Sequence, residues 1–175
     1  MEENRKQYLP VNWTDGMKMN KTHLVAERNA LQQMAVQAAG SNITGINYGL
    51  LPPVAETQAP FKIFISTDNQ QQVQIRLASC RAVTPGGAVI DIQEEDGAAT
   101  PLGASIPGLS VPVSELKNKA ETFYVVLTVN LYNRVPAGDA QPGEIPPRLP
   151  WAAPVYTLSL VPQNQLNGVR TGLYH

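Results

Sequence analysis

The stretch "FKIFISTDNQQQVQIRLASCRAV", residues 61–83, holds two alternating apolar runs joined by a polar turn, and it indicates the fold more clearly than the rest of the chain. The apolar residues occupy every second position: Phe61, Ile63 and Ile65 in the first run, then Val73, Ile75 and Leu77 in the second. A period of two is typical of antiparallel strands that bury one face. The residues between the runs, Thr67, Asp68 and Asn69, predict a hairpin turn.

Four more β-rich runs surround this hairpin: GINYGLL (45–51), AVIDI (88–92), TFYVVLTVNLY (122–132) and PVYTLSLVP (154–162). Turn residues separate them, including the TPGG that precedes AVIDI. Strands do not alternate with helices, which disfavours a parallel sheet. The sequence therefore predicts a mainly β fold of about six strands, an antiparallel β-sandwich with one N-terminal α-helix. A partly open barrel is the alternative architecture.

One helix is predicted ahead of the strands, from Asn20 to about Ala39. Asn20 or Thr22 is expected to cap its N-terminus, and Gly40 fits the position just after its last turn. A thin stripe of apolar and small residues runs along it: Leu24, Leu31, Met34, Ala35 and Ala38. We expect this stripe to dock the helix onto another surface, either the sheet or a second copy of the helix.

Two long segments have no regular pattern, residues 94–121 and residues 133–154. We expect the first to be a loop with a brief strand or helical turn near residues 114–118. The second is rich in proline and holds Trp151, which favours contact with a partner; a Trp that covers its own core is the alternative. We expect one domain in three parts: an arm and turn over residues 1–19, the helix over 20–40 and the β-sandwich over 41–175.

The composition disfavours several classes of protein. Charged residues make up 15% of the chain, against about 25% in typical soluble domains, which indicates uncharged surface for a partner to cover. The formal net charge is -1 and no basic cluster stands out, so a nucleic-acid binder is disfavoured. No run approaches the roughly 20 apolar residues of a membrane span, and the N-terminal residues do not resemble a secretory signal.

Residues with catalytic or metal-binding chemistry are sparse. His23 and Glu27 share a helix face, but a zinc site needs three or four ligands and the other histidine is His175. No nucleophile elbow, phosphate-binding loop or marked carboxylate pair is present. Cys80 is expected to be a small hydrophobic residue, half-buried in a strand. We therefore predict no metal, no cofactor and no enzymatic activity, and we expect His23 to be a structural histidine whose hydrogen bonds are satisfied.

The opening segment W-x-D-G-x-x-M-x-x-x-H resembles the N-terminal signature of the TssK family, the baseplate proteins of bacterial type VI secretion systems. The matching positions are Trp13, Asp15, Gly16, Met19 and His23. The segments NYGLL, RAVTPGGAVIDI and FYVVLTVNL are similar to strands that follow in the family. The family's usual Pro-x-His-Phe-Gln-Gln is not kept, since Lys21 and Leu24-Val25-Ala26 stand there. The departure indicates a remote branch, or a related phage-like injection machine.

The resemblance implies a non-enzymatic assembly subunit with a sandwich like the shoulder domain of phage receptor-binding proteins. It implies a cytoplasmic bacterial location, in a baseplate that faces the inner-membrane complex. It also implies docking onto wedge proteins of the TssF/TssG type and a homotrimer in the full-length protein, with no nucleic acid bound and no direct insertion into the membrane. Family members are much longer, so the chain would correspond to the N-terminal shoulder domain alone.

Two of the matching residues then have a specific expected role. Trp13 would be a buried anchor that pins the arm to the sandwich, and Gly16 would supply the turn. Leu31, Met34, Ala35 and Ala38 of the helix stripe would dock the helix.

Residues 134–154, with Arg134 and Trp151, would be the arm that faces the partner. The alternative function is a receptor- or carbohydrate-binding β-sandwich of a phage-tail-like machine, in which Trp151 and Tyr156 form a stacking platform. An enzyme of an unrecognised type is the third hypothesis.

Overall fold

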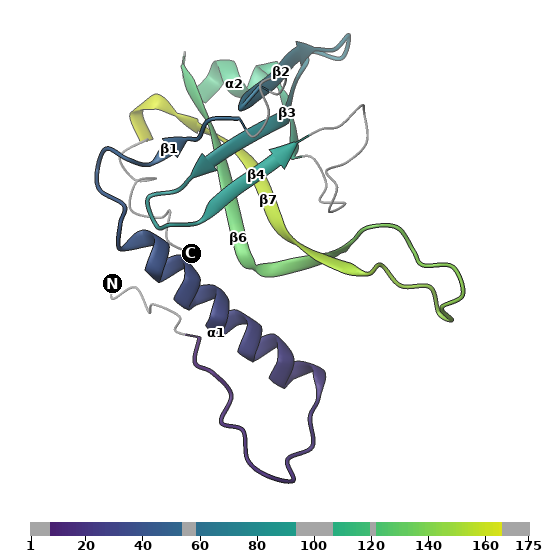
Figure 1. The fold of residues 1–175 in the computed structure, drawn as a ribbon. Coiled ribbons are helices and arrows are strands. Elements are labelled where there is room, and N and C mark those ends of the chain that lie inside the picture. The colour runs from purple at the N-terminus through teal and green to yellow at the C-terminus, as the bar shows by residue number, and fades with distance from the viewer. Residues whose placement is uncertain (1–7, 54–58, 94–106, 120–121, 166–175) are drawn as a thin grey trace.

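The computed structural model describes residues 8–53, 59–93, 107–119 and 122–165. Its helices are α1 (Lys21–Gly40), α2 (Val113–Lys119) and a 3-10 turn at Gln163–Gln165. Its strands are β1 (Gly49–Leu50), β2 (Phe61–Thr67), β3 (Gln72–Val83), β4 (Val89–Gln93), β5 (Gly108–Pro112), β6 (Phe123–Ala137) and β7 (Trp151–Pro162). All strand pairs are antiparallel, so the predicted mainly β fold with one long helix is confirmed (Figure 1).

The long strand β3 lies at the centre of a five-stranded sheet. Cys80 pairs with both Phe61 of β2 and Ile92 of β4, so β2 and β4 lie on opposite edges of β3. Ile75 pairs with Ile65 of β2 and with Leu109 of β5, so β2 and β5 also lie on opposite edges of β3. The predicted turns that connect the first three long strands are both present: Asp68 N–H donates to Gln72, and Gly87 N–H donates to Thr84.

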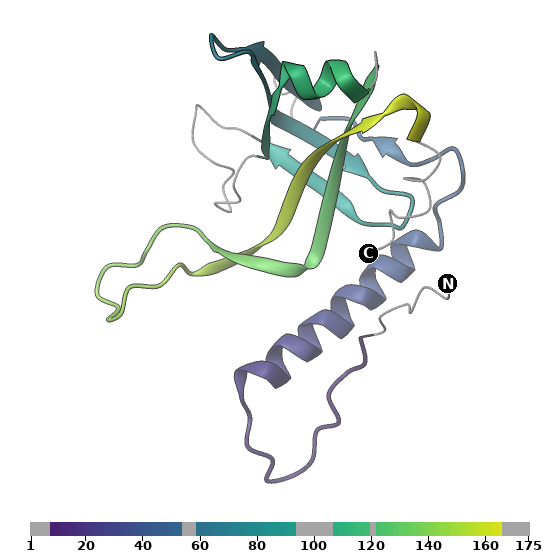
Figure 2. The ribbon, with the colours of Figure 1, turned by 180° about the vertical axis from the view of Figure 1, so that it is seen from behind.

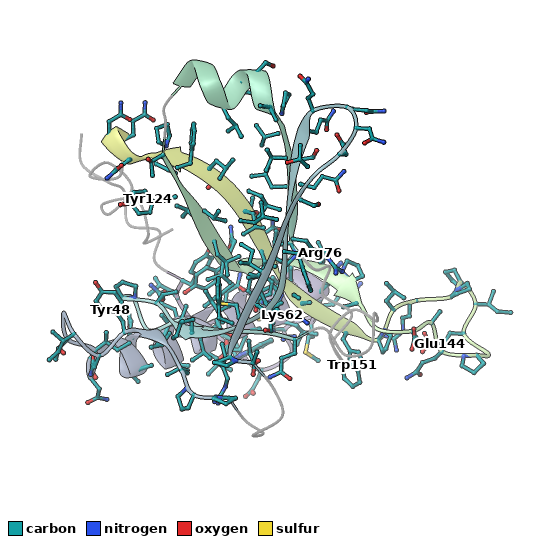
Figure 3. The ribbon with its side chains drawn as sticks, turned by 90° about the horizontal axis from the view of Figure 1, so that it is seen from above. Tyr48, Lys62, Arg76, Tyr124, Glu144 and Trp151 are labelled. Carbon is teal, nitrogen blue, oxygen red and sulfur yellow. The ribbon has the colours of Figure 1, made fainter. Side chains whose placement is uncertain are left out.

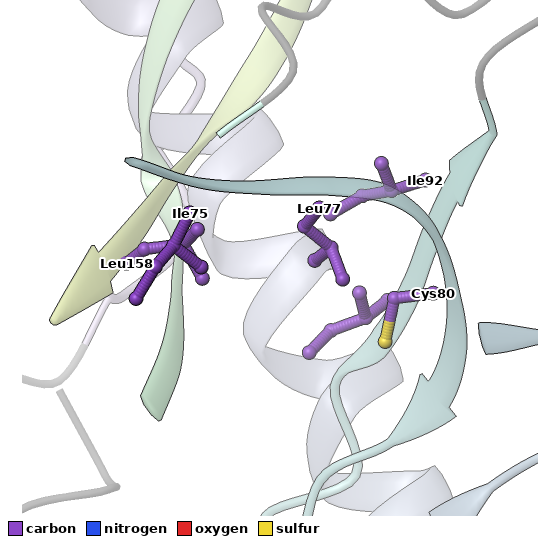
Figure 4. Packing of buried hydrophobic residues seen from close by; sticks show 6 residues of the cluster. Ile75, Leu77, Cys80, Ile92 and Leu158 are labelled. Atoms are coloured by element: carbon purple, nitrogen blue, oxygen red, sulfur yellow. The ribbon is translucent and has the colours of Figure 1, made fainter. Parts of the chain in front are cut away.

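The second layer is a two-stranded ribbon of β6 and β7, which crosses in front of the sheet when the molecule is seen from behind (Figure 2). The core lies between the layers and takes its buried residues from β3, β4 and β7: Ile75, Leu77, Cys80, Ile90, Ile92 and Leu158. Leu77 and Ile92 are the largest side chains that are almost fully buried (Figure 4). Two antiparallel layers around one core form the sandwich arrangement.

An irregularity in β3 decides which residues enter this core. Lys62 pairs with Ser79 but Ile63 pairs with Leu77, so Ala78 has no partner in β2. The extra residue reverses the alternation of the strand, and Cys80 therefore points to the same side as Leu77, three positions away. The expectation that Cys80 is a small hydrophobic residue in a strand is confirmed, and the residue is fully buried rather than half-buried.

Helix α1 begins where the sequence predicts. The side chain of Asn20 accepts hydrogen bonds from the backbone N–H groups of Thr22 and His23, as an N-cap does. The expected role of Gly40 is wrong: it is the last helical residue, and Ser41 is the C-cap. Gly40 lies against the turn between β3 and β4, where a Cβ atom would sit 3.1 Å from the carbonyl oxygen of Gly86. Glycine is present for close packing rather than for a left-handed conformation.

The two long segments that were expected to be mainly loops contain regular structure. The helical turn expected near residues 114–118 is confirmed as α2. β5 and α2 follow each other between residues 108 and 119, which raises the strand count of the described residues to seven. The expected loop at 133–154 is wrong at its two ends, because Arg134–Ala137 of β6 pairs with Trp151–Pro154 of β7. It is confirmed for residues 138–150, which belong to no helix or strand. Only the residues between the two strands form the tip of the ribbon. No helix in the described part of the chain is long and apolar enough to cross a membrane.

Candidate docking surface

The opening motif folds into a turn that leads into α1. Met17 N–H donates to the carbonyl of Thr14 at 3.2 Å, and Gly16 between them has a φ of 76°. A residue with a Cβ atom is strained at this positive φ, which accounts for the glycine. The turn brings the indole ring of Trp13 edge-on to the imidazole of His23, with 6.0 Å between the ring centroids. The spacing of the motif therefore serves a contact within the motif itself.

Two expectations for the motif are corrected, and two further residues of the motif lie at the surface. Trp13 is 46% exposed and contacts the start of α1, so it is not a buried anchor on the sandwich. Nδ1 of His23 is buried without a hydrogen-bond partner among the described residues, so this imidazole is not fully satisfied. Met19 is 62% exposed and Asp15 is exposed as well, so neither contributes to the core. The structure brings Trp13 and His23 together and leaves Asp15 and Met19 at the surface.

The arm before the motif runs along α1 and is held by helix side chains. Tyr8 N–H donates to Oε1 of Gln33 at 2.6 Å, and Val11 N–H donates to Oε2 of Glu27 at 2.9 Å. The ring of Tyr8 also stacks on Tyr132 of β6, with centroids 4.2 Å apart. The carboxylate of Glu27 therefore binds the backbone of the arm. The described residues contain no group of three His, Cys, Asp or Glu side chains placed to hold a metal ion.

A bulge in β6 joins the ribbon to the helix. The register of β6 and β7 shifts between Asn130 and Arg134, and the Asn130 side chain accepts the N–H groups of Tyr132 and Asn133. Beyond the bulge, Nη1 of Arg134 donates to Oδ1 of Asn29 at 2.7 Å.

Arg134 therefore faces α1, and its expected role as a partner-facing residue is wrong. Burial lowers the pKa of Arg134 from its ordinary value, and the nearby positive charge of Arg28 lowers this pKa further.

The face of α1 that points away from the ribbon is apolar and exposed. Asn29 and Ala30 are the buried residues of the helix. Most of the predicted stripe lies on the opposite side, where Leu24 and Leu31 are each 55% exposed, and Met34 on the flank is 51% exposed. Of the two surfaces expected for this stripe, the sheet of its own chain does not cover Leu31 and Met34. Docking onto a second copy of the helix stays a prediction.

The helix uses small and polar residues for its internal contacts, and it presents its larger apolar residues outward. No charged residue occurs between Leu31 and Gly40, so half of this outward face is free of charge.

The ribbon projects a second apolar group beyond the body of the fold (Figure 1). Ile145 is 97% exposed, Leu149 41% and Trp151 58%, while Glu144 and Arg148 form an ion pair at 2.6 Å beside them. Figure 3 shows Trp151 near the base of this projection and Glu144 towards its tip. The sequence signal for this tip is a proline-rich segment with an isolated isoleucine. Of the exposed apolar residues in this segment, only Trp151 was predicted to contact a partner.

The stacking platform of the alternative function does not form. Trp151 and Tyr156 lie five positions apart in β7, or about 17 Å along an extended strand. Tyr156 packs against the core and against Ala137 and Ala153, and burial raises the pKa of its phenol. The Cys80 thiol is similarly buried in the core, and burial raises its pKa, followed by the negative charge of Asp91. A raised pKa keeps the thiol protonated, which is the opposite of nucleophile activation.

Comparison with known proteins finds no match. No family model matches the sequence, no curated protein matches it, and no solved structure matches the fold.

Proposed function

We propose that this chain is a non-enzymatic docking module, the N-terminal domain of a baseplate subunit in a contractile injection machine of the type VI secretion kind. The observation that carries the proposal is the outward face of α1, where Leu24, Leu31 and Met34 are each about half exposed. In a folded domain this face would normally be turned inward. Here the helix turns it to the outside, in position for a partner.

The energetics support docking at this face. Covering the exposed half of three large apolar side chains contributes about 1 kcal/mol for each of them. The Ala35 and Ala38 positions of the same stripe have small side chains, which allow a partner helix or strand to approach closely. The projecting end of the ribbon, with Ile145 in its tip and Trp151 at its base, supplies a second contact that reaches away from the body. A central apolar cluster with aromatic residues is characteristic of protein interfaces.

The assignment to a baseplate rests on the resemblance of the motif from Trp13 to His23. The turn at Gly16 and the contact of Trp13 with His23 give this spacing a structural purpose at the start of α1. We propose wedge proteins of the TssF/TssG type as the partner and a homotrimer for the full-length protein. The proposed location is the bacterial cytoplasm, at the baseplate facing the inner-membrane complex.

Co-purification tests this function. The chain is expressed with the wedge proteins of its own machine, and the complex is isolated through a tag on the wedge. We expect the chain to be retained, and we expect Leu31→Glu to abolish retention because it places a charge at the centre of the outward face. The control is Ile46→Glu, the same kind of change at a loop position that is 93% exposed. Absence of retention of the unmodified chain would rule out the proposal.

A further inference from the structure

The outer edge of β2 presents backbone groups that no other described residue pairs with. In an antiparallel ladder, alternate residues bond to the neighbouring strand and the residues between them face away. The hydrogen bond from Asp68 N–H to the carbonyl of Gln72 sets the phase of this ladder. Phe64 and Ser66 therefore bond towards β3. The outer edge receives the N–H and C=O groups of the residues that alternate with them, Phe61, Ile63, Ile65 and Thr67.

The side chains beside this edge are apolar and incompletely covered. Ile63 packs against the core, but Ile65 on the same face is 62% exposed although its cross-strand neighbour Ile75 is only 4% exposed. The apolar face of the sheet is therefore left partly uncovered at its edge strand, β2. One more strand beside β2 would cover Ile65 and would pair the outward backbone groups. Exposed apolar edge strands are normally covered or blocked by charge.

The opposite face of β2 is cationic. Nζ of Lys62 lies 4.9 Å from the ring centroid of Phe64, and the guanidinium of Arg76 lies 5.1 Å from the same centroid. Figure 3 shows Lys62 and Arg76 on the neighbouring strands. Lys62 belongs to the edge strand itself and is exposed, so its ammonium group would lie directly beside an added strand. An acidic side chain on that strand would complement it.

We propose that the β2 edge binds an extended segment of a partner protein as an added strand, with apolar side chains over Ile65 and an acidic side chain beside Lys62. Backbone hydrogen bonds supply affinity in this mode of recognition, and the alternating side chains supply specificity. This surface lies on the sheet and not on α1. The inference therefore does not depend on the proposed function.

A second copy of the chain fits this edge less well than an acidic segment. It would bring another Lys62 to the edge, which adds positive charge to the same site. β2 itself has no carboxylate, and Asp68, the residue that follows it, is already engaged in its own turn: its carboxylate accepts N–H groups from Gln70, Gln72 and the side chain of Gln74. Charge therefore favours an acidic segment from a different protein.

The probe is a synthetic peptide of about nine residues that alternates valine and glutamate, long enough to cover β2. Amide hydrogen exchange of the full chain is measured with and without it. We expect the N–H groups of Ile63, Ile65 and Thr67 to exchange at least about tenfold more slowly with saturating peptide. A peptide with lysine in place of glutamate should give no protection.

Two pairs of variants separate charge from backbone pairing. Lys62→Glu should abolish protection, whereas Lys62→Arg keeps the charge and should retain it. Ile65→Pro removes an outward N–H without removing a hydrogen bond to β3, so the fold should persist and peptide binding should be lost. Ile65→Val keeps the N–H and should bind.

Three results would overturn the inference. The first is unchanged exchange of these amides at about millimolar peptide. The second is undiminished binding by both Lys62→Glu and Ile65→Pro. The third is protection that grows with protein concentration in the absence of peptide, which would identify a second copy as the occupant. None of these results bears on retention by wedge proteins, which is tested through Leu31.

Discussion

Oδ1 of Asn29 accepts a hydrogen bond from Nη1 of Arg134 at 2.7 Å, and this contact joins α1 to the β6–β7 ribbon across 105 residues of sequence. Asn29 is only 8% exposed, and a second guanidinium nitrogen of Arg134 is buried without a partner among the described residues. A buried polar group that loses its partner costs more than the bond itself contributes. The position of α1, and with it the direction of its outward face, depends on this contact.

Removing either partner of this contact should therefore destabilise the fold. We expect Asn29→Ala and Arg134→Ala each to lower the free energy of unfolding by about 1–3 kcal/mol. In the double variant the loss should be smaller than the sum, with a coupling energy of about 1 kcal/mol or more. Urea denaturation of the four proteins measures this cycle. Strict additivity would show that the two side chains do not interact in solution.

The contact between the end of α1 and the turn after β3 should tolerate no side chain. Gly87 has a φ of 88°, and a Cβ atom there would lie 2.5 Å from the carbonyl oxygen of Val36 and 2.6 Å from the N atom of Gly40. These are backbone atoms that cannot move aside cheaply. We expect Gly87→Ala to cost about 3 kcal/mol or more, measured by denaturant unfolding.

A matched glycine in the ribbon separates conformational strain from this steric clash. Gly143 also has a positive φ, 95°, but a Cβ atom there meets nothing within 4 Å. Gly143→Ala should therefore cost only about 1–2 kcal/mol, the strain of a left-handed residue. Equal losses for Gly87→Ala and Gly143→Ala would mean that the end of α1 does not pack closely against the turn.

Cys80 should resist alkylation until the protein unfolds. Burial raises the pKa of the thiol, so little thiolate is present in the folded protein near pH 8. We expect iodoacetamide to modify native protein at least about 100-fold more slowly than protein in urea, as measured by mass spectrometry. Cys80 is the only cysteine, so the adduct reports a single site. Comparable rates in both conditions would contradict its burial.

The same raised pKa has a consequence for stability. A group whose pKa is raised on folding supports the folded state below its ordinary pKa, and this support is lost as the pH rises through the raised value. Tyr156 acts in the same direction, because burial also raises the pKa of its phenol. Stability should therefore fall above about pH 9. Cys80→Ala should reduce the part of this fall that starts at the lower pH.

The sequence predicted the strands where one face is buried and the other exposed, because alternation is a local signal. It predicted β2, β3 and the turn at Asp68 for this reason. It could not predict that Ala78 has no partner in β2, since a bulge depends on which residues of two strands face each other. β5 was missed because its apolar residues are few and its partner is β3, more than 30 residues earlier.

The sequence predicted part of the candidate docking surface. The stripe of Leu24, Leu31 and Met34 was visible in the sequence, but periodicity gives the existence of an apolar face and not its direction. Its direction is set by the contact of Asn29 with Arg134 and by the close approach of Gly40 to Gly86, which are long-range contacts. The inward side of α1 carries an asparagine and a glycine. The usual expectation that the largest apolar residues of a helix face the core therefore does not hold here.

The affinity of the chain for the wedge proteins tests docking through the outward face of α1. The dissociation constant is measured by titrating the chain and its variants with the purified wedge complex. Leu24→Glu and Leu31→Glu should each weaken binding at least about tenfold, equivalent to about 1.4 kcal/mol, while their unfolding free energies stay within about 0.5 kcal/mol of the unmodified chain. Ile46→Glu should leave binding unchanged. Equal affinities for all four proteins, or no binding by any of them, would contradict docking through the outward face of α1.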